Sequence, residues 1–597
     1  MKKRVIASLL CMAMGLSLVA CGGNDTATET TTDNAATEET AEEAPAEETT
    51  EEAPAEDAEA TEAEEEFHLQ LAINSGSPAN FDYTTCASTP DFSWLSHMYE
   101  GLMKYGPSDV QITTNEDIHQ ATLQLGMAES YEYDEETYTY TFHLRDNLFY
   151  SDGEPIEAED FVYAFQRNQD PEVASAHASE VNGIIKNATE VYNGEVPVEE
   201  LGVSAPDSKT VVFELVANNP SFLDLCAANF AAPVRKELVE SQGEEYMATL
   251  ENVVSNGAYK LTEWDPGIQI TLEKNEYYYD VENLGPDKIT YNDCTNETTL
   301  LANYMADEWD FVSGTPAAQR EELIASGDLY SGPAIGLTYL YMNVENTPDW
   351  RVRAAYLLAI DRENIVNNVT KNGAIPASGL IPAGCTNTED GTEWTTYAGE
   401  PAPMYYWLSE NYPDYDLSDY IGRCELAQAL YQEAVDDGFD TTTSPTIIFT
   451  NSEVNKAMAE SIQTDLKNVL GCNLLIQGQD SGTDFTQDYT LGRLSLSAGS
   501  PDTFQFFGCF GTNGAFENSH WSSAAYDELL AEASMLPGGA ERDAASLELE
   551  RIMFSDEGFG HCPLYYSAYS FCLKDGISNL YYQPGGTVMH FMYATQE

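Results

Sequence analysis

Residues 127–167 read MAESYEYDEETYTYTFHLRDNLFYSDGEPIEAEDFVYAFQR, and this stretch places a strand, a turn and a helix in close succession. From Tyr138 to Leu144, large apolar residues alternate with Thr and His, which is typical of a strand with one buried face. Ser151-Asp152-Gly153 then marks a turn. We expect a helix to begin at Ala158, because acidic residues in a first turn favour a helix N-terminus.

Strands and helices follow one another without a fixed order along the rest of the chain. An opening helix is expected over Thr89–Met103, with Thr89 as its N-cap and Pro90 at its first position. The apolar periodicity predicts strands at 210–215 and 268–272 and helices at 351–360 and 424–434. There is no strict strand–helix–strand order and no internal repeat, so the sequence predicts a mixed α/β protein with several lobes.

The N-terminus indicates export. Residues 1–20 combine a cationic start with an apolar run, as in a secretory signal peptide, and Leu18-Val19-Ala20-Cys21 resembles a bacterial lipobox. We therefore expect lipid attachment at Cys21 and a location on the extracytoplasmic face of the cell membrane, because two acyl chains anchor a protein firmly. The alternative is an ordinary signal peptide in which the cysteine is incidental.

Residues 21–66 are expected to form a disordered linker between this anchor and a globular body. The segment 24–66 carries 18 acidic residues and no basic or aromatic residue, so it cannot bury enough apolar surface to offset the entropy of ordering. A role as an acidic interaction tail is the alternative.

The charge of the chain limits its partners. The 597 residues include 101 acidic and 25 basic side chains, a net charge of −76, and 83 of the acids and 22 of the bases lie in the body, 67–597. Binding to nucleic acid requires Lys and Arg to displace counterions from phosphates, so nucleic acid is excluded as a partner. The body is too long for one domain, and none of its apolar runs approaches the roughly 18 residues that span a bilayer.

The cysteines of the body indicate neither a disulfide framework nor a zinc site. There are nine of them, an odd number, at wide spacings and without a CxxC pair. We expect most of them to be small buried side chains. One bridge is allowed, but the sequence does not assign it.

Several segments, in order along the body, resemble the extracellular solute-binding proteins, family 5, of ABC importers, and the oligopeptide-binding type in particular. Besides 127–167, these segments are 81–105 (FDYTTCASTPDFSWLSHMYEGLMKY), 201–215 (LGVSAPDSKTVVFEL), 253–264 (VVSNGAYKLTEW), 270–280 (ITLEKNEYYYD), 339–366 (YLYMNVENTPDWRVRAAYLLAIDRENIV), 525–533 (AYDELLAEA) and 562–567 (CPLYYS).

The resemblance implies an α/β, periplasmic-binding-protein-like fold (class II, cluster C) with two large lobes, an extra subdomain and a hinged ligand cleft. Lobe I would comprise 67–99, 235–335 and 569–597, the subdomain 100–234, and lobe II 336–568. It also implies a monomer without enzymatic activity, cofactor or metal, which closes on a peptide and delivers it to ABC permease subunits in the membrane. Exposed strand edges would pair with the peptide backbone, while roomy pockets accept varied side chains.

The same resemblance implies four ligand-binding residues: Thr89, His177, Tyr339 and Asp502. Either Tyr339 or Tyr341 would face the cleft. A carboxylate must match the peptide ammonium. In the family, an aspartate binds this ammonium group. Alignment on Pro501 puts Ser497 at the position of that aspartate, whereas an alignment with a short deletion puts Asp502 there. Ala334 stands where the family has an aromatic residue in the wall of the ligand site. Thr89 has the N-cap as its alternative role, and His177 a place on the surface.

Other functions remain as alternatives. The binding fold could carry a non-peptide cargo, such as an oligosaccharide or a metal chelate, or a signalling peptide, and it could serve as a receptor without a transporter. A secreted hydrolase with paired carboxylates is a further alternative. The sequence contains no G-x-S-x-G, H-E-x-x-H or glycine-rich phosphate loop.

Overall fold

The computed structural model describes residues 66–596, except 74–77, 87–90, 112–117, 317–318, 480–488, 513, 515–517, 584 and 586–587. The expected signal peptide, Cys21, most of the linker and Thr89 lie outside the described residues. Among the described helices, none is both long and apolar enough to cross a bilayer.

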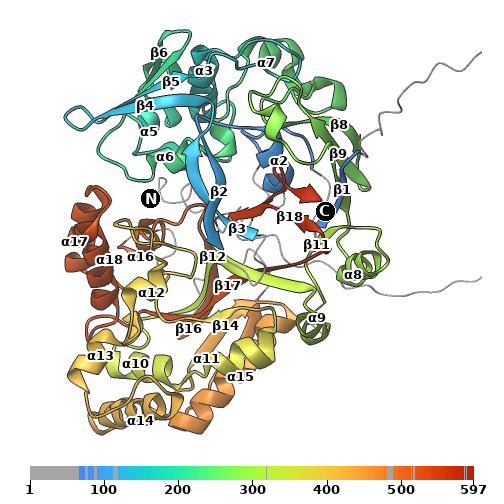
Figure 1. Ribbon diagram of the computed structural model, residues 1–597. Coiled ribbons are helices and arrows are strands. Elements are labelled where there is room, and N and C mark those ends of the chain that lie inside the picture. The colour runs from blue at the N-terminus through green and yellow to red at the C-terminus, as the bar shows by residue number, and fades with distance from the viewer. Residues whose placement is uncertain are drawn as a thin grey trace, which may run out of the picture.

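An eleven-stranded sheet runs through the middle of the molecule and connects its two ends (Figure 1). Its strands, in spatial order, are β15 (Leu475–Gln479), β14 (Thr446–Thr450), β16 (Leu491–Ser497), β12 (Leu329–Met342), β17 (His561–Leu573), β11 (Phe311–Ser313), β1 (His68–Ile73), β10 (Lys288–Asp293), β9 (Gln269–Lys274) and β8 (Tyr259–Asp265), with β13 (Ile375–Pro376) paired beside β17.

Three smaller sheets contain the remaining strands. The first is β2 (Met103–Gln111), β3 (Ile118–Leu125), β19 (Leu580–Gln583) and β20 (Val588–His590); the second is β4 (Ala128–Asp134), β5 (Thr139–Leu144), β7 (Thr210–Glu214) and β6 (Val203–Asp207); the third is β18 (Ile577–Ser578) with β21 (Thr595–Gln596).

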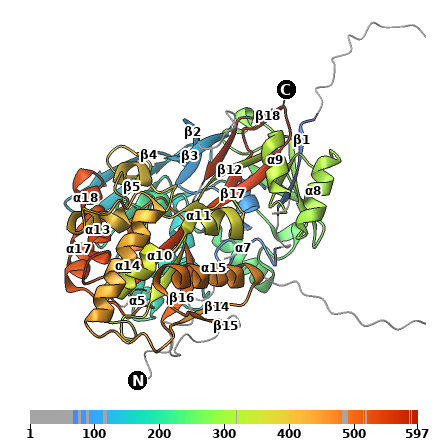
Figure 2. The same cartoon turned by 90° about the horizontal axis from the view of Figure 1, so that it is seen from below.

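The helices pack against the large sheet and against the sheet of β4, β5, β7 and β6. Those of the first half of the chain are α2 (Phe92–Met98), α3 (Ala158–Gln169), α4 (Ala178–Val181), α5 (Ala188–Tyr192), α6 (Phe222–Leu225), α7 (Lys236–Gln242), α8 (Glu297–Met305) and α9 (Arg320–Ser326). Those of the second half are α10 (Trp350–Ala359), α11 (Arg362–Asn364), α12 (Trp394–Ala398), α13 (Tyr406–Asn411), α14 (Tyr420–Asp436), α15 (Glu453–Leu470), α16 (Phe504–Phe510), α17 (Ala524–Ser534) and α18 (Ala540–Met553). In the view from below, α10, α14 and α15 form one group of helices, and α15 of this group contacts β14 (Figure 2).

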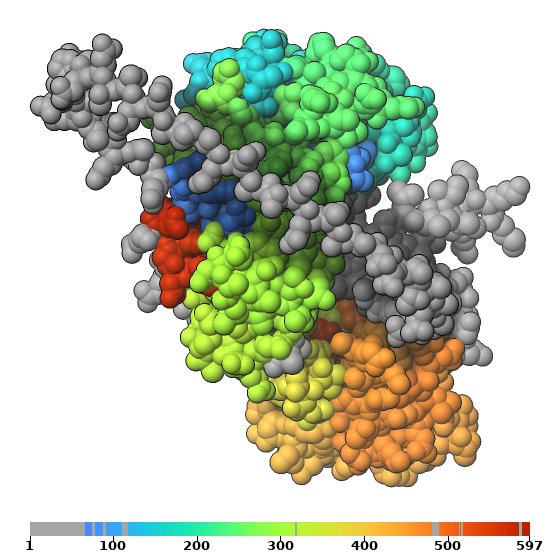
Figure 3. Space-filling view, turned by 90° about the vertical axis from the view of Figure 1, so that its right-hand side faces the viewer, coloured from blue at the N-terminus to red at the C-terminus, as the bar shows by residue number. Residues whose placement is uncertain are grey.

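The apolar side chains gather in three large cores. The first core contains only residues between Ile335 and Tyr566. The second lies around β5, β7 and α3. The third combines buried apolar side chains from the ranges 69–99 and 232–311 and from the C-terminal strands. In the space-filling view, residues of the β5–α3 region form the top of the molecule, and orange residues from the second half of the chain form its bottom (Figure 3). The expected domain boundaries stay a prediction.

β12 and β17 are the two long strands that pass from one core to another. Ile335–Met342 of β12 packs in the 335–566 core, whereas Leu329 belongs to a small separate cluster. β17 likewise places Tyr566 in the first of these cores and Phe571 in the third. The register of the β12–β17 pair shifts between Pro333 and Leu337, in the middle of the crossing. A shift of this kind bends a strand pair locally.

Local periodicity predicted the helix and strand of the opening stretch correctly. β5 spans Thr139–Leu144, with Tyr140, Phe142 and Leu144 buried. α3 begins at Ala158, and a capping box fixes its start: the Glu157 N–H donates to the Asp160 carboxylate, which sits three residues on. The elements expected at 210–215, 268–272, 351–360 and 424–434 are also present, as β7, β9, α10 and α14.

The opening helix is shorter than expected, and this prediction was wrong at its C-terminal end. α2 ends at Met98, Tyr99 is already extended, and Met103 starts β2. The Met103 N–H donates to the Cys226 carbonyl (3.2 Å), and that carbonyl oxygen also fills the place of a Cβ on Gly101. A tertiary contact therefore ends the helix, despite the helical spacing of Leu102.

All nine cysteines of the body are free, and six of them are buried. The expectation of small buried side chains is confirmed for most of them, and the described residues contain no disulfide.

Candidate functional site

β16 offers an open strand edge next to the boundary between the cores. Along one edge it pairs with β12 over its whole length, from Gly336↔Ser497 to Met342↔Leu491. Along the other edge it pairs with β14 only at Leu491 and Gly492. From Arg493 to Ser497, no described strand continues the sheet on that side. Because alternate residues of a strand direct N–H and C=O groups to each side, this edge can accept the backbone of an added strand.

The side chains on one face of this edge are polar. Thr338 and Ser495 lie opposite each other and share a hydrogen bond between their hydroxyls (2.8 Å). Arg493 and Ser497 project from the same face as Ser495, since side chains two apart in a strand share a face. We call Arg493, Ser495 and Ser497 the polar face of β16.

The loop after β16 holds a charged pair. The Arg542 guanidinium of α18 donates to both Asp502 carboxylate oxygens, at 3.0 and 2.8 Å, and stacks on Phe504 at 3.9 Å from the ring centroid. Only 2% of the Arg542 side chain and 13% of the Asp502 side chain are exposed. The Phe504 N–H also donates to Asp502 (3.0 Å), so the carboxylate is fixed just before α16.

This carboxylate connects the loop after β16 with α6, which lies far from it in the sequence. The Ser221 hydroxyl, at the start of α6, donates to Asp502. Three residues on, Asp224 accepts a hydrogen bond from the Tyr105 hydroxyl of β2 (2.7 Å). Burial, together with the charge of Asp502, raises the pKa of Asp224 to about 6.

A third segment reaches the same place. A Cβ on Gly585, between β19 and β20, would collide with the carbonyl group of Gly499, so the two backbones touch. The stretch 493–502 therefore meets residues from all three expected bodies. We call this region, with the open edge of β16, the junction.

The chain matches a known class of binding protein. The family model of the bacterial extracellular solute-binding proteins, family 5 (middle region), matches residues 122–518. This chain belongs to that family.

Several known proteins are similar to this chain in sequence or in structure. It is 28% identical over 510 residues to the periplasmic oligopeptide-binding protein OppA of Escherichia coli K12, covering 83% of this chain and 87% of OppA. It is 29% identical over 458 residues to the probable deoxycholate-binding periplasmic protein YgiS of the same strain, covering 75% and 80%. The solved structure of the periplasmic murein tripeptide-binding protein MppA, in an unliganded open form, matches with a TM-score of 0.72 at 25% identity, over 89% of this chain and 98% of MppA.

The periplasmic-binding-protein-like fold expected from the sequence is thereby confirmed, because the matching structures are periplasmic peptide-binding proteins. The family and these relatives are binding proteins that act outside the cytoplasm. Among the residues that the structure describes, no group of three or more His, Cys, Asp or Glu side chains is placed to hold a metal ion.

The predicted ligand residues are distributed unevenly around the junction. Asp502 lies at the junction, bound to Arg542, and Ser497 is exposed at the end of the polar face of β16. Tyr339 and Tyr341 are both fully buried, Tyr339 against Phe510 and His561 and Tyr341 against Tyr489.

His177 is buried rather than on the surface. One ring nitrogen lies 2.8 Å from Glu180 and the other 2.7 Å from the Cys86 carbonyl, and the ring stacks on Phe230. Burial is the largest single influence on the pKa of His177 and lowers it, but the hydrogen bond to Glu180, the charge of Glu180 and the hydrogen bond to the Cys86 carbonyl together outweigh it, with a net rise. The ligand roles of Thr89, His177, Tyr339 and Asp502 stay predictions.

Three functional candidates were missed by sequence reasoning: Ser221, Asp224 and Arg493. The first two lie in the loop and short helix after β7, far from Asp502 in the chain, and no local pattern marks them. Arg493 had a signal, because Arg493, Ser495 and Ser497 alternate with Leu494 and Leu496 as in a strand with one polar face.

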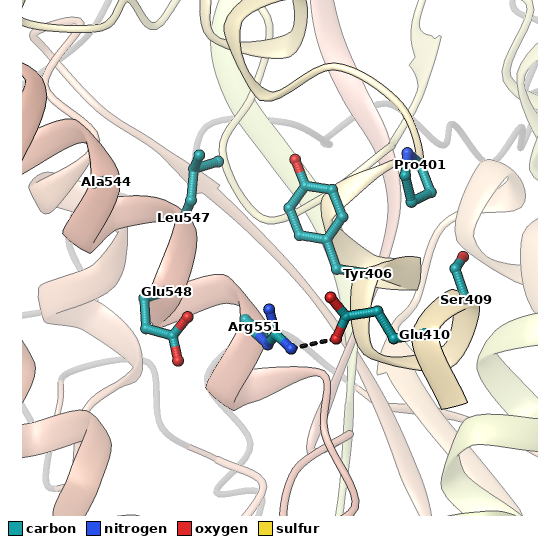
Figure 4. Close-up of a pocket in the computed structure, with 8 residues that line it drawn as sticks. All are labelled: Pro401, Tyr406, Ser409, Glu410, Ala544, Leu547, Glu548 and Arg551. Carbon is teal, nitrogen blue, oxygen red and sulfur yellow. Dashed lines mark hydrogen bonds and ion pairs between the residues drawn. The ribbon is translucent and has the colours of Figure 1, made fainter. Parts of the chain in front are cut away.

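A separate hollow lies between α13 and α18. Its volume is about 460 Å³, and its lining includes Tyr406, Leu547 and the ion pair of Glu410 with Arg551 (Figure 4). Arg551 stands nine residues after Arg542, roughly 13 Å further along α18. This hollow is therefore distinct from the junction, and its cation already has a partner.

Proposed function

We propose that this chain captures short peptides outside the cell and delivers them to an ABC permease. The open edge of β16 at the junction is the observation that carries the proposal. A strand edge forms hydrogen bonds with the main chain of a peptide and makes few demands on its side chains. OppA and MppA are named for oligopeptide and murein tripeptide binding, which agrees with this use of the site.

In this proposal, Cys21 carries the lipid anchor, the acidic linker spaces the body from the membrane, and the protein acts as a monomer without chemistry of its own. Lobe I (67–99, 235–335, 569–597) with the subdomain (100–234) closes against lobe II (336–568). The bend occurs where β12 and β17 cross between the cores, at the register shift after Pro333. The ligand favours closure because it contacts both sides only in the closed form.

The ammonium group of the peptide is proposed to bind between Asp502 and Asp224. With both carboxylates ionised, the three groups Asp224, Asp502 and Arg542 carry one net negative charge. An arriving ammonium would neutralise this charge and relieve the repulsion by Asp502, which adds to the effect of burial in raising the pKa of Asp224.

A calorimetric comparison of free-amine and N-acetylated tetrapeptides tests this proposal. We expect the free amine to bind the full chain at least about tenfold more tightly. Asp502→Asn should remove that difference. Ser221→Ala, which deletes the cross-lobe hydrogen bond but keeps the charge, is the matched control and should retain it. Unchanged affinity in a folded Asp502→Asn variant would reject the clamp.

A non-peptide cargo is the second candidate, and two observations favour it. Asp502 already has a cation, Arg542, and the relative YgiS is named for deoxycholate. A saturating ligand at a hundredfold excess over Kd stabilises the native state by about 2.7 kcal/mol. Thermal stabilisation by deoxycholate or oligosaccharides, and by no peptide, would replace the peptide assignment.

A further inference from the structure

The two carboxylates at the junction differ in their partners. The Arg542 guanidinium donates to both oxygens of Asp502, at 3.0 and 2.8 Å. Among the residues that the structure describes, no lysine, arginine or histidine pairs with Asp224, and the side chain that donates to it is the neutral Tyr105 hydroxyl (2.7 Å). The charge of Asp502 is therefore matched within the fold, whereas the charge of Asp224 is not.

Two contacts fix the position of Asp224. Tyr105 lies on β2, which contacts α6, and a tyrosine side chain has only two torsions, so its hydroxyl is offered from a nearly fixed place. On the other side, Ser221 at the start of α6 donates to Asp502. Residues three apart on a helix are neighbours on its surface, so Asp224 lies on the side of α6 that faces Asp502.

The Tyr105 hydroxyl also opposes the protonation of Asp224. Burial raises the pKa of Asp224, the hydrogen bond from Tyr105 lowers it, and the charge of Asp502 raises it again, to about 6 in all. The Tyr105 hydroxyl stays a donor, because burial and the charge of Asp224 raise its own pKa well above the ordinary value. The Cys226 thiol, two residues after Asp224, stays neutral for the same two reasons.

We propose that Asp224 supplies the unmatched charge of the ammonium site, and that Tyr105 is the positioning residue that keeps this carboxylate in place and ionised, so that a proton and the peptide ammonium compete for it. The inference rests on the proposed binding of a free-amine peptide at the junction. Above about pH 6 the carboxylate is ionised and attracts the ammonium. As the pH falls through this value, the proton takes the place of the ammonium, and a free-amine peptide loses its advantage.

Free-amine and N-acetylated tetrapeptides, titrated calorimetrically into the full chain from pH 5 to 7.5, measure this competition. The peptide amine stays largely protonated in this range, since its pKa is about 7.7–8.0. The ratio of the two affinities cancels pH effects that do not involve the amine. We expect the free-amine peptide to bind about tenfold more tightly at pH 7.5 and less than about twofold more tightly at pH 5, with the midpoint near pH 6.

Three variants assign the effect. Tyr105→Phe keeps the ring and removes the donor, so the midpoint should rise by about one pH unit or more. Asp224→Asn should abolish both the free-amine advantage and its pH dependence. Tyr133→Phe is the matched control, because it removes a hydroxyl that donates to the neutral Asn218 amide (2.8 Å) instead of a carboxylate, and it should keep the midpoint of the unmodified chain.

Proton release gives a second measurement. At pH 6, binding of the free-amine peptide should release about half a proton from the unmodified chain, seen as a binding heat that depends on the ionisation enthalpy of the buffer, and none from Asp224→Asn. This comparison decides the matter should Tyr105→Phe not fold.

Several outcomes would overturn the inference. They are a free-amine advantage that does not change between pH 5 and 7.5, a midpoint that stays in place in Tyr105→Phe, and an equal rise of the midpoint in Tyr133→Phe. In each of these cases the free amine is still preferred, so the proposed ammonium site stands and only this inference fails. If the acetylated peptide binds equally well at every pH, the ammonium site fails with it, and if no peptide binds, the proposed function fails.

Discussion

Arg542→Met should lower the free energy of unfolding by about 3–5 kcal/mol, because it leaves the largely buried Asp502 carboxylate without its cation. The pair is shielded from water, with Arg542 2% and Asp502 13% exposed, so the solvent cannot replace the lost partner. Chemical denaturation followed by tryptophan fluorescence measures the change.

Two further variants separate the charge from the packing. The double variant Arg542→Met with Asp502→Asn should recover much of the loss, since no unpaired charge then remains. Arg551→Met breaks the exposed ion pair with Glu410 and should change the stability by less than about 1 kcal/mol. Equal losses for Arg542→Met and Arg551→Met would show that the Asp502–Arg542 pair does not hold the junction together.

Acidification should destabilise the protein through His97. Its neutral ring uses both nitrogens: Nδ1 donates to the Ser93 carbonyl (2.8 Å) and Nε2 accepts from the Phe591 N–H (2.9 Å). Burial lowers the pKa of His97 to about 4 from 6.5. Between these values the unfolded chain binds the proton and the folded chain does not, so stability is complete above about pH 6.5 and falls as the pH is lowered through 4. The expected loss is about 3 kcal/mol.

The pH dependence of His97→Gln should be flatter over this range than that of the unmodified chain, whatever the absolute stability of the variant. Glu550 serves as a control of opposite sign. Burial raises the pKa of Glu550 to about 7, so this residue favours the folded state at low pH, and the contribution is lost as the pH rises from 4.5 through 7. Glu550→Gln should therefore steepen the acid loss. Parallel pH profiles for all three proteins would contradict these assignments.

Patterns among neighbouring residues predicted the helices and strands. The geometry of the candidate site depends on contacts between residues that are far apart in the sequence. The alternation from Tyr138 to Leu144 and the acidic first turn after Ala158 are local, and both elements formed where expected. The end of α2 depends on Cys226, more than a hundred residues away, which no periodicity contains.

Only the part of the candidate site that resembles a family motif could be predicted from the sequence. Asp502 was expected at the ligand, but the Arg542 that holds it and the Ser221 that reaches it from the subdomain come from distant segments. The open edge of β16 results from β14 diverging after two paired residues, which is a property of sheet topology.

The most direct test of the account is small-angle X-ray scattering from the full chain with and without a saturating free-amine tetrapeptide whose binding calorimetry has established. Closure of the lobes across β12 and β17 predicts a smaller radius of gyration and a shorter maximum dimension in the presence of the peptide. Scattering curves that stay superimposable while the peptide is bound would contradict closure, and with it the mechanism of capture proposed for the junction.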